Sequence, residues 1–168
     1  MTRKNITETD PIGFARHDHR ACIEGGVAAA DSYCRNAGLQ FTQVRRRVLE
    51  ILLARHRAMG AYEILDILRD EGLGSQPPVV YRALDFLVNH GFAHRIEHLN
   101  AFAACSHRGK HHTPAFLICR VCGSVAEAQV DGPASFLGDA AAATGFDIER
   151  TVVEVEGVCP NCRDRAAK

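Results

Sequence analysis

The sequence lacks the features of a membrane protein or a secreted one. None of its apolar stretches approaches the roughly 20 residues that a membrane-spanning helix needs. Its first residues, Met1 to Pro11, are polar and contain no apolar run, so no secretory signal peptide is expected. The seven cysteines are an odd number, which argues against a framework made only of disulfides. We therefore expect a soluble cytoplasmic protein whose cysteines bind metal or react.

The sequence also lacks an excess of charge of either sign, since 20 Lys and Arg residues balance 20 Asp and Glu residues. A single DNA-binding domain is usually basic, so this balance counts mildly against nucleic acid as a partner. A neutral sum can still hide a basic face. We interpret five clustered arginines as candidate phosphate contacts, with an ordinary charged helix face as the alternative: Arg45, Arg46, Arg47, Arg55 and Arg57.

The first hundred residues show the pattern of a winged helix-turn-helix, after a tail expected at residues 1–15. Apolar residues recur at helical spacing in four segments. These segments are residues 16–37, a helix capped by Thr42, a helix from Ala61 to Leu68, and a helix from Pro77 that stops at Gly91. Two short runs, Phe92 to Glu97 and Leu99 to Ala104, then predict a hairpin. We place this DNA-binding domain at residues 16–98.

From residue 113 the pattern becomes α/β. It predicts strands at 114–118 and 124–130, a helix at 133–143, and a strand at 146–158 in which valine alternates with glutamate. The fold class is therefore α+β: a winged helix, a hinge or linker at 99–112, and a small dimerisation and zinc-binding domain at 113–168. The predicted sheet is small and has open edges, so pairing with a second copy into a homodimer is expected.

Tyr81 and Arg82 lie on the outward face of the helix that begins at Pro77, near its N-terminal end. In a winged helix this helix enters the major groove of DNA. Arginine can pair bidentately with guanine, and tyrosine can contact a base or a phosphate. We predict that both residues contact DNA; the alternative is an exposed pair with no ligand.

Two Cys-x-x-Cys pairs are the clearest chemical signal: Cys119-Arg-Val-Cys122 and Cys159-Pro-Asn-Cys162. Zinc prefers thiolates in a tetrahedron, and each pair places two sulfurs on one side of the ion. The pairs are farther apart than the roughly 15–20 residues typical of a zinc ribbon, so a helix and a strand must lie between them. We predict a structural zinc site; four buried or redox-active thiols are the alternative.

A second group of metal-type residues gathers where the two predicted domains join. His94 and Cys105 belong to the hairpin, and Glu127 follows the first cysteine pair. The linker adds three histidines, His107, His111 and His112. One Cys, one Glu and two His would complete a tetrahedral zinc site that fixes the angle between the domains. The alternative is a solvated loop beside a core cysteine. The N-terminal group of His17, His19 and Cys22 is a weaker candidate, more typical of a solvated tail.

Four segments carry a resemblance to a known family: PPVVYRALDFL at 77–87, GFAHRIE at 91–97, HTPAFLICRVCG at 112–123, and the closing cysteine pair. Together they resemble the ferric uptake regulator (Fur) superfamily over about residues 25–165, and its zinc uptake regulator (Zur) branch most. The resemblance implies a DNA-binding winged helix followed by an α/β dimerisation domain. It assigns the structural zinc to the four paired cysteines, and a second, regulatory zinc to His94, Cys105, His112 and Glu127.

The sequence departs from the iron and peroxide regulators of that superfamily. They usually carry His-His-Asp-His before the first cysteine pair, whereas this chain has His111-His112-Thr113-Pro114. A thiolate at Cys105 also suits zinc better than octahedral iron. An iron-, manganese- or peroxide-responsive regulator is the alternative function. Val79 and Gln43 stand where the family often has Thr and Pro, which bears on DNA contact and helix capping.

These expectations describe a zinc-responsive transcriptional repressor. Zinc at the regulatory site would favour the domain orientation that matches two half-sites of a palindromic, AT-rich operator, and the resemblance implies repression of zinc-uptake genes. The expected partners are double-stranded DNA and a second copy, without a membrane or a small organic substrate. We do not expect an enzyme, because four protein ligands close the site; an open position would favour a hydrolase. A thiol redox sensor and a zinc-buffering module are the other rival functions.

Overall fold

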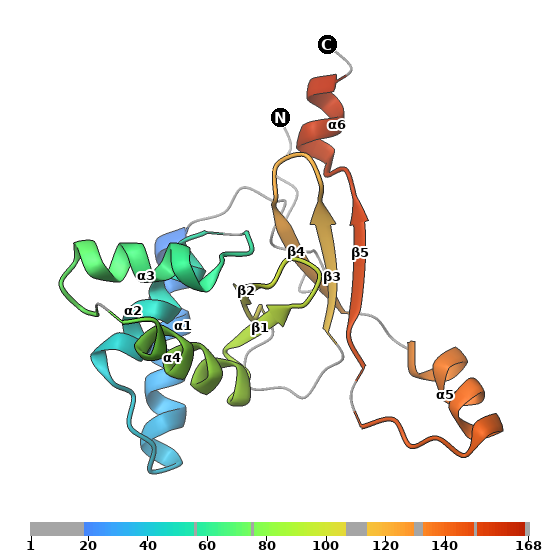
Figure 1. The fold of residues 1–168 in the computed structure, drawn as a ribbon, viewed down its shortest axis with the longest axis horizontal. Helices are drawn as coiled ribbons and strands as arrows, with labels where there is room; N and C mark the ends of the chain where they lie inside the picture. Colours follow the sequence, from blue (N-terminus) through green and yellow to red (C-terminus); the bar gives the residue numbers. More distant parts are fainter. Residues whose placement is uncertain are drawn as a thin grey trace.

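The computed structural model describes residues 19–55, 57–74, 76–106, 114–129, 133–149 and 151–166. Four helices come first, then a hairpin, then a three-stranded sheet with two further helices (Figure 1). The hairpin lies between the helices and the sheet, so the two halves of the chain meet along it. No described helix is both long and apolar enough to pass through a bilayer.

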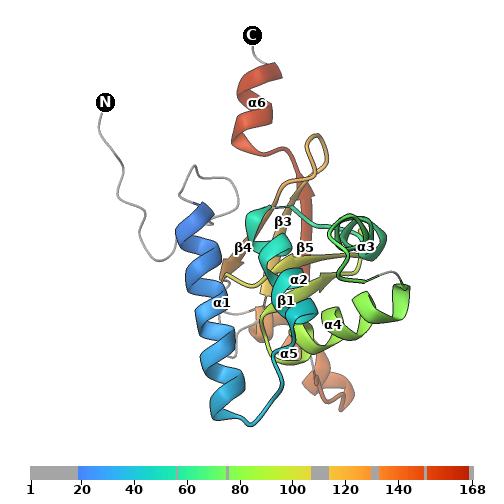
Figure 2. The same cartoon turned by 90° about the vertical axis from the view of Figure 1, so that its left-hand side faces the viewer.

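The four N-terminal helices form because their apolar stripes pack into one core. Their bounds are α1 His19–Asn36, α2 Gln43–Ala54, α3 Ala61–Asp70 and α4 Pro77–Asn89. Thr42 caps α2 as predicted, since its side chain accepts the Arg45 N–H. α1 runs alongside α2 (Figure 2). The core is made mainly of fully buried aliphatic side chains: Leu49, Leu52, Ile64, Leu65, Leu84 and Leu87.

The predicted hairpin is confirmed as the antiparallel pair β1 Ala93–Ile96 and β2 Ala101–Ala104. β2 therefore occupies part of the range 99–112 that the sequence suggested as a linker. The segment between α2 and α3 contacts both halves of the chain, because Met59 pairs with Phe102 on β2 and Arg57 pairs with Ser124 beside the sheet. This segment thus links the hairpin to the C-terminal half.

The sheet has the order β4-β3-β5, with β3 antiparallel to β4 and parallel to β5. Its elements are β3 Pro114–Cys119, β4 Val125–Gln129, α5 Pro133–Thr144, β5 Val153–Gly157 and α6 Pro160–Ala166. The strand expected at 146–158 is shorter, because only 153–157 lies beside β3, whose partners run from Ala115 to Cys119. α6 was not predicted from the sequence.

One face of the sheet carries a row of three side chains, one from each strand. Glu127 on β4 and Glu154 on β5 both lie opposite Phe116 on β3. Residues directly opposite one another point to the same face of a sheet. The hairpin packs on this face, where Ile96 joins Phe116 in a small buried apolar cluster.

Candidate metal centres and nucleic-acid interface

The four paired cysteines are brought together by the parallel pairing of β3 and β5. Cys119 is the last residue of β3 and lies opposite Gly157, the last residue of β5, so both strands end at the same edge. A turn after β3, with Gly123 at a φ of 70°, folds Cys122 back. The first turn of α6 does the same for the second pair, as the Cys162 N–H donates to the Cys159 carbonyl.

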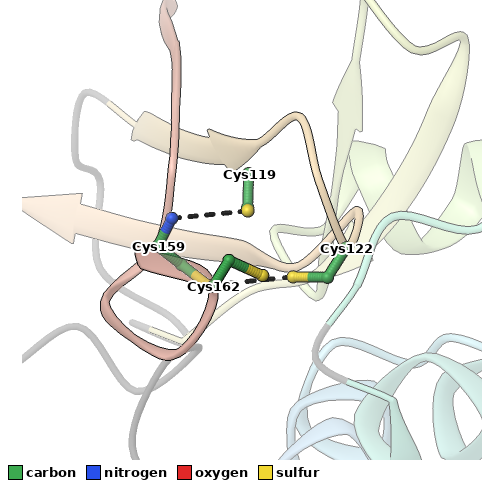
Figure 3. Close-up of side chains that lie close together, drawn as sticks. All are labelled: Cys119, Cys122, Cys159 and Cys162. Carbon is green, nitrogen blue, oxygen red and sulfur yellow. Dashed lines mark hydrogen bonds between the residues drawn. The ribbon is translucent and has the colours of Figure 1, made fainter. Parts of the chain in front are cut away.

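The spacing of the four sulfurs fits a zinc ion. All four Sγ atoms lie within 4.8 Å of one another, and Cys122 Sγ is 3.8 Å from Cys159 Sγ (Figure 3). A tetrahedron with zinc–sulfur bonds of about 2.3 Å has sulfur–sulfur edges of about 3.8 Å. Three of these side chains are buried in a cluster of their own: Cys119, Cys159 and Cys162.

Neighbouring groups lower the pKa of two of these cysteines, Cys119 and Cys122, and so favour their thiolate forms. The Cys159 N–H donates to Cys119 Sγ over 3.3 Å, and this bond lowers the pKa of Cys119 to about 6. The Ser124 hydroxyl, 3.2 Å from Cys122 Sγ, lowers the pKa of Cys122. The neighbouring Cys122 sulfur raises the pKa of Cys162 to about 12. Close thiolates repel one another, and a divalent cation among them removes that repulsion.

The second cluster joins the hairpin to the sheet. His94 lies on β1, Cys105 directly follows β2, and Glu127 lies on β4; one ligand atom of each lies within 4.8 Å of the other two. His94 Nε2 is 3.1 Å from Glu127 Oε1, and Cys105 Sγ is 4.0 Å from the same oxygen. The Ser106 N–H donates to Glu127 Oε2 over 2.7 Å. Three of the four predicted regulatory ligands are therefore close together.

The chemistry of this cluster also fits zinc. Glu127 is 5% exposed and is the buried charged residue of the described part of the chain. A buried carboxylate costs several kcal/mol unless charge or hydrogen bonds compensate it. Imidazole, thiolate and carboxylate are all zinc ligands, and bonds of about 2.0 Å give nitrogen–oxygen edges of about 3.3 Å. The other candidate ligands, His107, His111 and His112, lie outside the described residues, as does His17; of His19 and Cys22 only the backbone is described.

Tyr81 and Arg82 occupy the face of α4 that points away from the core. Both side chains are exposed, Tyr81 by 40%, whereas Val80 and Leu84 are fully buried. Neither has a hydrogen-bond or ion-pair partner among the described residues. The N-terminal part of α4 therefore presents a free guanidinium and a free phenol to solvent.

The predicted arginines of α2 pair with acidic or aromatic groups. Arg45 stacks over the Phe86 ring at 3.7 Å, and Arg46 Nη2 is 2.8 Å from Asp31 Oδ1. Arg47 binds Glu71, and that bond raises the pKa of Arg47 above its already high value. Such partly exposed pairs contribute roughly 0–1 kcal/mol, so a phosphate can compete for these side chains.

Arg55 and Arg57 lie elsewhere, after the end of α2. Both guanidinium groups approach the Glu63 carboxylate, and the Arg57 backbone pairs with Ser124 next to the cysteine cluster. Arg57 is therefore located where the two halves of the chain meet. A count of basic residues in the sequence could not separate this position from the α2 face.

Sequence reasoning missed two groups that support the metal ligands. The Ser106 N–H, which holds Glu127, is a backbone group and leaves no mark in the sequence. The Ser124 hydroxyl could have been found, because it comes directly after Gly123 at the end of the first cysteine turn.

Comparison with known proteins identifies relatives of this chain in sequence and in structure. The family model described as the ferric uptake regulator family matches residues 36–156. The zinc uptake regulation protein of Escherichia coli K12 is 36% identical over 137 residues, covering 81% of this chain and 80% of its own. A zinc uptake regulator complexed with zinc and DNA superposes with a TM-score of 0.83 at 34% identity, covering 87% of this chain and 98% of the other. Holo XcZur superposes with a TM-score of 0.75 at 38% identity, covering 83% and 98%.

Proposed function

Because this chain belongs to the ferric uptake regulator family, we propose that it is a zinc-responsive transcriptional repressor. The observation that carries the proposal is the closeness of His94, Cys105 and Glu127, which come from both halves of the chain. A zinc ligand set at that position couples zinc binding to the placement of the winged helix. The likeness to zinc uptake regulators makes zinc-uptake genes the proposed target.

We further propose two zinc ions per chain. The four cysteines hold the structural ion, and His94, Cys105 and Glu127 hold the regulatory ion together with His112. A closed tetrahedral site needs a fourth ligand. His112 comes two residues before Pro114, which pairs with Gln129 on the strand that carries Glu127. A closed site leaves no position for an activated water, so we propose no enzymatic activity.

The active form is proposed to be a homodimer that acts in the cytoplasm. β5 is an edge strand, and Val155 on it is 48% exposed. Val158 and Leu117 line an apolar hollow beside that edge. A second copy of the chain would cover this surface and present two α4 helices to a palindromic, AT-rich operator.

The proposed mechanism is a shift between orientations of the winged helix. When bound, zinc supplies one centre shared by the hairpin and the sheet. His94 and Cys105 move with the winged helix, whereas Glu127 belongs to the sheet, so orientations that bring the three together are favoured. Tyr81 and Arg82 then reach base edges in both half-sites. Four arginines from α2 and the segment after it are proposed to contact DNA phosphates: Arg45, Arg46, Arg47 and Arg57.

The test measures binding of the full chain to operator DNA, first selected from a random library, over a range of buffered zinc. We expect specific binding to strengthen by roughly 10- to 100-fold as the regulatory site fills. Cys105→Ala should abolish this zinc dependence. Cys34→Ala, which changes a buried cysteine outside both clusters, is the matched control. Equal binding by the wild-type protein with zinc and with chelator would overturn the proposal.

A further inference from the structure

The turn of the hairpin is held by a carboxylate from β5. Glu154 Oε1 accepts the Glu97 N–H over 2.7 Å, and Glu154 Oε2 accepts the His98 N–H over 3.0 Å. The two partners are 57 and 56 residues away in the sequence, in the other half of the chain. Both oxygens of one carboxylate are thus used by two successive backbone donors.

This contact lies at the opposite end of β1 from the regulatory cluster. At one end, His94 is 3.1 Å from Glu127, and its ring meets the Phe116 ring with centroids 5.3 Å apart. At the other end, the turn after Ile96 reaches Glu154. Since Glu127, Phe116 and Glu154 form one row across the sheet, the hairpin contacts the row from end to end, with β1 at Glu127 and Phe116 and the turn at Glu154.

Two separate contacts fix the orientation of the hairpin on the sheet, whereas contact at one end would let the hairpin rotate about that end. The regulatory cluster holds the base of the hairpin, at His94 and Cys105, but makes no contact with its turn. We propose that Glu154 is a positioning residue for DNA binding: it clamps the hairpin turn onto β5 without metal and sets the angle that the regulatory site then locks. This inference rests on the proposed function and adds a second determinant of operator affinity.

The clamp uses two backbone donors held by the turn, whereas the neighbouring contact of His98 with Glu156 joins two exposed side chains. Charge-assisted bonds from backbone N–H groups to a carboxylate are roughly twice as strong as neutral ones. His98 Nε2 is also 3.1 Å from Glu156 Oε2, but these side chains are 60% and 49% exposed. Exposed pairs of this kind contribute little. Glu156 therefore offers a matched control on the same strand and facing the same turn.

The experiment compares Glu154→Ala, Glu154→Gln and Glu156→Gln in the full zinc-loaded chain. Hydrogen exchange resolved by NMR reports the amides of Glu97 and His98. Fluorescence anisotropy gives affinity for the selected operator and for random DNA, and zinc content is measured on the same samples.

For Glu154→Ala we expect faster exchange at both amides and about tenfold weaker operator binding, with random-DNA binding and zinc content unchanged. Glu154→Gln keeps one acceptor oxygen and should fall between this variant and the wild type. Glu156→Gln should match the wild type. A general structural defect would instead weaken binding to both DNAs and lower zinc content.

Unchanged exchange at Glu97 and His98, or operator binding equal to wild type in Glu154→Ala, would overturn the inference. The proposed function is judged separately, by the zinc dependence of the wild-type protein. If that dependence is absent while the exchange of Glu154→Ala rises, the clamp exists but the repressor proposal has failed.

Discussion

The two candidate metal centres differ in what they connect. The four-cysteine cluster joins the end of β3 to the first turn of α6, so all its members belong to the C-terminal half. The regulatory cluster of His94, Cys105 and Glu127, called the mixed cluster below, joins β1 and the end of β2 to β4, across the boundary between the halves. A metal within one unit stabilises its fold, whereas a metal between two units changes their relative orientation.

Their ligands match these different tasks. Four thiolates bind zinc tightly and leave no position open, and the cluster uses close neighbours in sequence for each half of the tetrahedron. The mixed cluster takes single residues from three elements, so it forms only when the hairpin lies against the sheet. The predictions below separate a fold-supporting site from an orientation-setting one.

Removing one structural ligand should have the largest effect. Cys119 is the last residue of β3, and Cys119→Ser replaces the sulfur that accepts the Cys159 N–H. Structural zinc sites supply about 10–16 kcal/mol of apparent binding energy, which is as large as the whole stability of a typical domain. We expect loss of the C-terminal fold and of the dimer, seen by circular dichroism and analytical ultracentrifugation. A stable, folded dimer of this variant would remove the structural role from the four-cysteine site.

Removing charge from the mixed cluster should spare the fold and lose one zinc. Glu127→Gln keeps the size of the side chain but removes the buried carboxylate beside His94 and Cys105. We expect zinc content by native mass spectrometry to fall from two ions to one, with the dimer retained. Zinc-dependent operator binding should weaken by roughly 10- to 100-fold. Glu149→Gln, which changes an exposed carboxylate after α5, serves as the control. Retention of two zinc ions and of wild-type DNA binding would contradict the assignment.

How far the sequence predicts these sites depends on the range of the contacts. The cysteine pairs are local, so their spacing alone predicted the structural cluster. The hairpin ligands His94 and Cys105 were predicted because both belong to the hairpin, where the two predicted domains join. The start of the last strand could not be predicted, since only residues 153–157 lie beside β3 and the residues from 146 do not extend the strand.

Apart from the metal ligands, the contacts between the halves were not revealed by the sequence. Glu154 alternates with valines as an ordinary exposed strand residue would, and its backbone partners carry no sequence signal. Arg57 looked like one member of a basic cluster, but its backbone pairs with Ser124. Periodicity predicts elements and faces, whereas the docking of one element on another is a property of the folded chain.

A substitution on α4, the helix proposed to contact DNA bases, should leave both metal centres intact. Arg82→Ala removes an exposed guanidinium from α4 that contacts no metal ligand. A good bidentate arginine–guanine pair is worth about 1–3 kcal/mol of discrimination, so operator binding should weaken by roughly 5- to 150-fold. Random-DNA binding and zinc content should stay unchanged, as measured by anisotropy and mass spectrometry. Arg163→Ala on α6 is the control. If operator and random DNA weaken equally, Arg82 contacts phosphate rather than a base.

The smallest effect is expected from the hydroxyl beside the four-cysteine cluster. Ser124 stabilises the Cys122 thiolate through a contact of 3.2 Å, and its removal leaves all four zinc ligands in place. One such hydrogen bond contributes about 1 kcal/mol. Ser124→Ala should therefore release the structural zinc to a chelator severalfold faster, while the regulatory zinc and operator binding remain as in the wild type. Faster loss of the regulatory zinc instead would show that the two centres are coupled through the Arg57–Ser124 pairing. The separation into a fold-supporting site and an orientation-setting site would then be wrong.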